Sequence, residues 1–270
     1  MSVILLLATA PAHSQTVSAQ TVDDRYQASI ALSGGVAAEL TLRFEGVVGL
    51  EPAALGVSVQ LVDPLSPSLL ARLPNLTSFT IPAAFPMLIQ IAPPVGGGFA
   101  FEGLYEIELY TRNLHYTAGT PLRIFRAPSG GVFRDVTENV SGGSYRPRGS
   151  GGDFSEFLIV ADLRSLSTVV NDKFARLSAL LNEHGAEIAS APRLTLEQLA
   201  AQAHQRWLAG DTEGAADTLS DFEAAVVTAA AAGELPRVWR SARDITNVDG
   251  GLRAASRTLR FSLNQVANGL

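Results

Sequence analysis

The chain has 270 residues, of which 47% are hydrophobic and 17% are charged, and its net charge at neutral pH is −6. This composition is typical of a folded globular protein, and the acidic balance disfavours non-specific binding to nucleic acid or to an anionic membrane. The chain contains no cysteine, which excludes disulfides, thiolate metal sites and cysteine nucleophiles.

The chain begins with a short apolar run, Val3–Ala10, which is followed by the small residues Ala12, Ser14 and Ala19. This is the pattern of a secretory signal, and the run is too short to span a bilayer as a helix. No Lys or Arg precedes it, so a packed or disordered N-terminal segment stays open as an alternative. We predict that residues 1–19 are a signal peptide and that the mature protein is periplasmic or secreted. No later stretch reads as a membrane-spanning helix.

Residues 20–163 show the alternation of apolar and polar side chains that marks half-buried strands. The clearest strand pattern lies in residues 104–111, where Tyr105, Ile107 and Leu109 alternate with Glu106, Glu108 and Tyr110. About seven to nine such segments are separated by turn signals, which favours an antiparallel β-sandwich of the immunoglobulin-like (Ig-like) kind. The residues 141–152, rich in Gly, Ser and Arg, are expected to form an exposed loop.

Residues 164–270 show the spacing of amphipathic helices instead. We expect the first helix to end at Gly185 in a left-handed conformation, and the second to open with a capping box at Thr195–Gln198. The remaining helix signals are a cap at Asp211, a helix start at Pro236, a turn at Asp249–Gly251 and a last helix over Leu252–Val266. Short loops between helices predict an up-and-down bundle. The expected fold class is therefore α+β, with a β-sandwich domain over residues 20–163 and a separate helical bundle over residues 164–270.

Two segments carry a family resemblance. Pro121–Asp162 has an Asp-Val-Thr turn ahead of a Phe-Ser-Glu-Phe strand, and it resembles the end of a β-sandwich module common in exported bacterial proteins. Leu196–Val227, centred on Gly210-Asp211, resembles helical-hairpin modules appended to bacterial surface and secreted enzymes. The whole chain is similar to an exported proteobacterial family of unknown function. That resemblance implies a location and an architecture, and it carries over no catalytic residues.

The charges of the helical half are segregated along the chain. Residues 196–234 contain seven acidic residues and one arginine, whereas residues 235–270 contain six arginines and two acidic residues. The candidate anion- or partner-binding residues are the stripe Arg253, Arg257 and Arg260 together with Arg237 and Arg240. One interpretation is that acidic and basic helices neutralise each other, and we favour it because such stripes are usually solvated or paired within the molecule. The other is a site for lipopolysaccharide, phosphate or an acidic partner.

Signals for catalysis are weak. The four histidines do not have the spacing of metal ligands, and no serine lies in a nucleophile elbow. Glu106, Glu108 and Asp135 are the carboxylates that a hydrolase of an envelope polymer would use. The strand alternation places the first two on a solvated sheet face. We expect no catalytic residue, no cofactor and no metal.

The sequence therefore predicts an exported, non-catalytic binding or assembly protein of the bacterial envelope. The expected partner is a protein or glycan of the envelope, and not nucleic acid. The alternative is an envelope-polymer hydrolase that uses loop carboxylates. A hydrolase requires a deep cleft with two converging carboxyl groups, whereas binding requires a patch or groove without such a pair.

Overall fold

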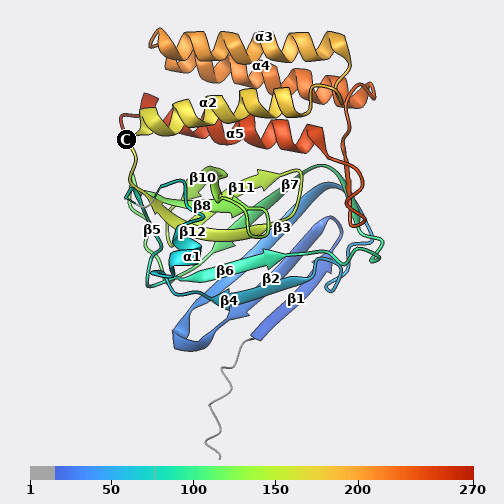
Figure 1. The fold of residues 1–270 in the computed structure, drawn as a ribbon. Coiled ribbons are helices and arrows are strands. Elements are labelled where there is room, and N and C mark those ends of the chain that lie inside the picture. The colour runs from blue at the N-terminus through green and yellow to red at the C-terminus, as the bar shows by residue number, and fades with distance from the viewer. Residues whose placement is uncertain (1–15, 76) are drawn as a thin grey trace, which may run out of the picture.

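The computed structural model describes residues 16–75 and 77–270, and the strands in this part of the chain form two antiparallel sheets (Figure 1). Sheet A has the order β1 (Thr16–Val22), β2 (Arg25–Ala31), β3 (Ala37–Val48), β7 (Ala100–Tyr110), β11 (Arg146–Gly151) and β10 (Thr137–Ser141), with β13 (Val238–Arg240) beside β7. Sheet B has the order β4 (Val57–Leu61), β6 (Met87–Ile91), β12 (Glu156–Asp162), β8 (Leu122–Ala127) and β9 (Arg134–Asp135), with β5 (Phe79–Thr80) beside β12.

The two sheets face each other across one apolar core. On β3 the buried residues Leu40 and Leu42 lie opposite Leu109 and Ile107 of β7, so the alternation of each strand sends the same face inward. Sheet B contributes buried side chains such as Ile89 to the same cluster. The strand pattern predicted around residues 104–111 is confirmed by β7, whose Tyr105, Ile107 and Leu109 are buried.

Four long helices lie over the β7, β11 and β10 part of sheet A, on the face that points away from this core: α2 (Leu166–Glu183), α3 (Ser190–Leu208), α4 (Thr212–Ala231) and α5 (Val248–Ala267). Helix α5 packs against β7, β10 and β11, α2 lies beside α5, and α3 and α4 form the outer layer (Figure 1). The short helix α1 (Pro67–Leu70) lies in the strand-rich half, where Leu69 packs with Phe125 and Leu158 of sheet B.

A strand interrupts the helical half. After α4 the chain returns to sheet A, and Val238–Arg240 pairs antiparallel with Ala100–Glu102 of β7. Trp239 is 6% exposed, and its ring lies 5.1 Å from that of Phe154 and 5.6 Å from that of Phe101, centroid to centroid. The indole thus joins the core between the sheets, which ties the helical half to the strand-rich half.

The prediction of an Ig-like β-sandwich followed by a separate up-and-down helical bundle is wrong. The described residues contain 13 strands, more than the expected number, and they form sheets of seven and six strands. The helices are not a separate unit, because α1 precedes most of the strands, β13 lies between α4 and α5, and α5 packs on sheet A. Periodicity shows which face of a helix is buried, but it does not show what buries that face.

The prediction of an exposed loop over residues 141–152 is also wrong, because half of this segment, Arg146–Gly151, forms the largely buried strand β11. Its glycines allow close approach of other backbone segments. A Cβ on Gly149 would lie 2.4 Å from the carbonyl oxygen of Val136, and one on Gly152 would lie 2.6 Å from the backbone nitrogen of Gly251. These glycines therefore serve packing against β10 and α5 rather than flexibility.

Of the predicted helix ends, one is confirmed by the structure and two are wrong. Asp211 caps α4 as predicted, since its carboxylate accepts a hydrogen bond from the backbone N–H of Gly214 at 3.0 Å. Gly185 does not have a positive φ, and its lack of a Cβ instead makes room for the side chain of Arg193. Thr195 does not open a helix, because α3 already begins at Ser190 and tolerates Pro192 in its first turn.

The last two helix predictions are wrong because both segments pack against sheet A. Pro236 leads into β13 rather than a helix. The segment Asp249–Gly251, expected to be a turn, is the first turn of α5, and Asn247 caps it by accepting a hydrogen bond from the N–H of Gly250 at 2.9 Å. A Cβ on Gly250 would lie 2.5 Å from the carbonyl oxygen of Gly103, so this glycine lets α5 approach sheet A.

Most of the predicted signal peptide, residues 1–15, lies outside the described residues, and residues 16–19 belong to β1.

Candidate functional site

A pocket of about 390 Å³ opens between α2 and β9, at one edge of sheet B. The segment that joins β12 to α2, the loop after α1 and one side of α5 complete its walls. Its lining includes six charged side chains: Arg134, Asp135, Arg164, Asp172, Lys173 and Arg176. The pocket is in the size range of small-molecule sites, and we therefore built the candidate site from these side chains.

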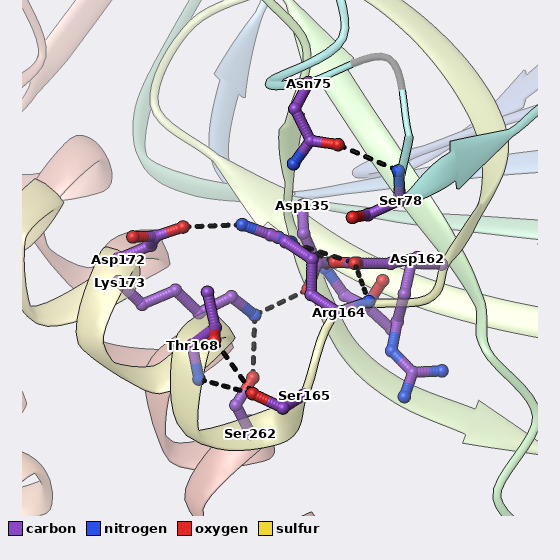
Figure 2. Close-up of polar contacts among 12 residues, drawn as sticks. Asn75, Ser78, Asp135, Asp162, Arg164, Ser165, Thr168, Asp172, Lys173 and Ser262 are labelled. Atoms are coloured by element: carbon purple, nitrogen blue, oxygen red, sulfur yellow. Dashed lines mark hydrogen bonds and ion pairs between the residues drawn. The ribbon is translucent and has the colours of Figure 1, made fainter.

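Lys173, the single lysine of the chain, is the buried cation of this pocket. It projects from α2 between β9 and α5 (Figure 2). Its Nζ lies 2.6 Å from Oδ2 of Asp135, 2.9 Å from Oγ of Ser262, and 2.7 and 3.0 Å from Oγ1 and the carbonyl oxygen of Thr258. An ammonium group has three N–H donors, so these contacts use all of its hydrogen-bonding capacity.

Asp135 is the carboxylate that balances this charge. Its Oδ1 accepts a hydrogen bond from the backbone N–H of Thr137 at 2.8 Å, and its side chain is 3% exposed. Burial alone would raise the pKa of Asp135, but the charges of Lys173 and Arg123 and the hydrogen bonds from Lys173 and Thr137 hold it below its usual range. The carboxylate is therefore ionised at neutral pH, and the pair is neutral as a whole.

Arg164 forms a second satisfied group on the pocket wall. Its guanidinium donates to both carboxylate oxygens of Asp162, at 2.6 and 2.9 Å, and to Oδ2 of Asp172 at 2.6 Å (Figure 2). The same guanidinium lies 4.8 Å above the ring centroid of Phe79. A bidentate contact and a ring below it fix this side chain, and it has little capacity left for a ligand.

Arg134 and Arg176 are the two pocket cations that take no part in the ion pairs of Lys173 and Arg164. The side chain of Arg134 is exposed and makes no ion pair with any residue in the described ranges. Arg176 is half-buried and has a long contact of 3.5 Å to the exposed side chain of Glu183, so the pair is weak. Burial, followed by the positive charge of Arg134, lowers the pKa of the Arg176 guanidinium, which places two like charges near each other.

The pocket therefore has a positive balance in an acidic protein. Four cations and two carboxylates line it, whereas the whole chain has a net charge of −6, and two further carboxylates just outside the lining, Asp162 beside Arg164 and Glu183 beside Arg176, offset part of this positive charge. Since Lys173 and Arg164 are held by carboxylates, the available positive charge belongs to Arg134 and Arg176. A concave site with one unpaired and one weakly paired guanidinium group attracts anions.

A comparison with protein families decides what the chain is related to. The model described as "Family of unknown function (DUF6689)" matches residues 2–267. The chain belongs to the DUF6689 family. The predicted resemblance to a family of unknown function is confirmed at that level, while its exported and proteobacterial character stay predictions. The search of curated proteins and the search of solved structures found no match to this chain.

The predicted arginine stripe of the DUF6689 protein lies away from the pocket and is paired. Arg253 contacts both carboxylate oxygens of Glu45 on β3, at 2.5 and 2.7 Å. Arg257 and Arg260 contact Glu223 of α4, at 2.6 and 3.2 Å. The other two arginines are paired at the surface, Arg237 with Glu102 and Arg240 with Asp244. The structure thus brings Arg253, Arg257 and Arg260 together with acidic residues of α4 and sheet A.

The carboxylates proposed for a hydrolase do not gather in one site. Glu106 and Glu108 lie on β7, where Glu106 is 3.5 Å from Arg257 and Glu108 is 2.5 Å from Arg148. Of the three candidates only Asp135 lines the pocket. Within the described ranges there is no group of three His, Cys, Asp or Glu side chains that could hold a metal ion. In the same part of the chain none of the helices has the length and apolarity needed to cross a membrane.

Sequence reasoning missed the pocket residues Lys173, Arg134 and Arg176. One signal was available for Lys173, which is the only lysine and lies three residues after the buried Val170 on α2. That spacing places it on the buried face of an amphipathic helix, where a lone charge requires a partner. No comparable signal marked Arg134 or Arg176, because their proximity depends on how α2 packs beside β9.

Proposed function

We propose that this DUF6689 protein is an exported, non-catalytic binding protein of the bacterial envelope, and that the pocket between α2 and β9 holds a group of its ligand. The observation that carries the proposal is the contrast inside the pocket: Lys173 and Arg164 are each paired with a carboxylate at 2.6 Å, while Arg134 and Arg176 lack a strong partner. The ligand is a component of the envelope, either a small molecule or a group of a protein or glycan.

The state of the pocket carboxylates favours binding over hydrolysis. A general acid must be protonated at the working pH, and a hydrolase with paired carboxyl groups needs one in that state. The pKa of Asp135 is lowered by its cationic neighbours, so this carboxyl cannot donate a proton at neutral pH. Asp172 is held by the guanidinium of Arg164 at 2.6 Å. The arrangement therefore fits a rigid site that binds a charged ligand.

The exported location rests on the sequence. The apolar run Val3–Ala10 before small residues is the pattern of a secretory signal, and a chain without cysteine is compatible with an oxidising compartment. Fractionation of cells that express the full chain, with N-terminal sequencing of the mature protein, tests this part. Recovery of the unprocessed chain in the cytoplasm alone contradicts it.

The binding proposal is tested by native mass spectrometry of protein purified gently from its own envelope. Ala179→Trp fills the pocket from an exposed lining position on α2, and Ala224→Trp makes the same change at an exposed position on α4. We expect a bound small molecule or glycan fragment with the wild type and with Ala224→Trp, and none with Ala179→Trp. Equal recovery from all three proteins would show that the pocket is not the site.

A further inference from the structure

We propose, on the basis of the proposed function, that the pocket recognises a phosphate monoester, with Arg134 and Arg176 as the residues that hold the phosphate group. This statement names the class of ligand for the site described above. It concerns residues that the sequence did not single out, and it differs from the predicted anion site at Arg253, Arg257 and Arg260, whose members are paired with acidic side chains.

The charge of the pocket sets the charge of the ligand. The available positive charge lies on Arg134, which makes no ion pair among the described residues, and on Arg176, whose contact to Glu183 is long at 3.5 Å. Lys173 is held by Asp135, and Arg164 by Asp162 and Asp172. A phosphate monoester carries a charge of about −1.5 to −2 at neutral pH, which is enough to pair with both guanidinium groups. A single carboxylate would leave one guanidinium without a counter-charge.

The chemistry of arginine supports the same class. A guanidinium group presents N–H donors in a planar fork, and it binds phosphate oxygens through two parallel hydrogen bonds. Arg134 reaches the pocket from β9 and Arg176 from α2, so the two forks come from opposite walls. A phosphate with three terminal oxygens offers acceptors for both guanidinium groups.

The uncharged residues of the lining indicate the chemical character of the group that is esterified to the phosphate. Val169, Ala175, Ala179 and Ala255 give the pocket an apolar surface, and its volume of about 390 Å³ lies in the range of sites that enclose small organic molecules rather than single ions. We therefore infer an ester with a compact apolar group. The ester belongs either to a soluble metabolite or to a lipid such as phosphatidic acid, and the two sources share the same phosphate chemistry.

Isothermal titration calorimetry with phenyl phosphate tests the inference, with benzyl alcohol as the neutral counterpart and succinate as a dicarboxylate of similar charge. We expect phenyl phosphate to bind and the other two to bind at least tenfold more weakly. Arg134→Ala and Arg176→Ala should each weaken the binding of phenyl phosphate at least tenfold, because each removes charge-assisted hydrogen bonds. Arg25→Ala, at an exposed arginine of β2, is the matched control and should leave the affinity unchanged.

The outcomes separate the inference from the proposed function. If benzyl alcohol or succinate binds as well as phenyl phosphate, or if the two arginine variants bind phenyl phosphate normally, the phosphate assignment is wrong. If phenyl phosphate fails to bind while the ligand recovered from the envelope still does, the assignment is wrong and the binding function stands. If neither binds, both proposals are wrong.

The source of the phosphate is resolved with vesicles of phosphatidylcholine that contain phosphatidic acid. Sedimentation of the protein with these vesicles, reduced by phenyl phosphate and by Arg176→Ala, supports a lipid phosphate. Binding of phenyl phosphate without sedimentation supports a soluble ester. Thermal melting of each variant, with the midpoint unchanged, shows that the loss of binding is not a loss of the fold.

Discussion

The Nζ of Lys173 and the Oδ2 of Asp135 lie 2.6 Å apart in a nearly dry site, with the two side chains 10% and 3% exposed. Removing one partner of a buried pair leaves an uncompensated charge, which costs about 3–5 kcal/mol. We therefore expect Lys173→Met to lower the free energy of unfolding by about this amount, as measured by denaturation with urea. The double variant Lys173→Met/Asp135→Asn should lose less than the two single variants combined. Asp172→Asn, at the exposed rim, is the control, and a cost for Lys173→Met no larger than its cost would contradict the prediction.

The same lysine provides a chemical probe, because the chain contains no other. An amine-specific reagent needs access to Nζ, which is enclosed by Asp135, Thr258 and Ser262 in the folded protein. We expect Lys173 to be modified slowly in native protein and rapidly in guanidinium chloride, as followed by peptide mass spectrometry. Asp135→Asn should accelerate the native reaction, since it weakens the enclosure. Equal rates in native and denatured protein would show that the ammonium is already accessible.

The candidate binding arginines should differ in how much each contributes to the free energy of unfolding. Arg253 is 7% exposed and contacts Glu45, Asp249 and Glu223. Arg253→Met therefore leaves Glu45 and Asp249 without their cation, while Glu223 keeps Arg257 and Arg260. We expect a loss of about 3–5 kcal/mol in the free energy of unfolding. Arg237→Met, which breaks an exposed pair with Glu102, should cost about 0–1 kcal/mol. Similar small losses in both variants would mean that the stripe is solvated, as an anion-binding surface requires.

Local periodicity predicted the elements that bury one face over several residues. The alternation in β7 and the apolar face of α2 are visible in the sequence because each residue repeats the same relation to the core. Residues Val238–Arg240 were predicted to be helical, and they form a strand because Trp239 packs among Phe99, Phe101 and Phe154. That choice depends on a contact with a distant segment, which a local pattern does not contain.

The candidate site was harder to predict from the sequence than the secondary-structure elements were. Its charged residues come from β9, from the segment after β12 and from α2, and none belongs to a motif with a fixed spacing. The arginines that do form a visible pattern, Arg253, Arg257 and Arg260, are spaced along one helix, and the structure shows that they are paired. Helical spacing thus shows that these arginines share one face of α5. It does not show their partners, because some of the acidic residues that neutralise them come from sheet A.

Glu138 on β10 gives the protein a dependence on pH. Burial raises its pKa from the ordinary 4.5 to about 7, and the nearby carboxylates Glu106 and Glu223 add to the shift, whereas Ser150 and Arg257 oppose it. Between pH 4.5 and 7 the folded state therefore keeps a proton that the unfolded state has released. The contribution of Glu138 to stability is therefore greatest below this range and falls as pH rises through it, by at most about 1.4 kcal/mol for each pH unit.

Glu138→Gln tests this dependence, because glutamine keeps the shape of the side chain and removes its titration. We expect the variant to match the wild type near pH 4.5 and to exceed it in stability above pH 7, as measured by the urea midpoint at each pH. The difference between the two proteins isolates Glu138, since all other groups titrate in both. Glu51→Gln, at an exposed glutamate in the loop after β3, should follow the wild type throughout. A constant difference between Glu138→Gln and the wild type across the whole range would show that the carboxyl between sheet A and α5 does not titrate there.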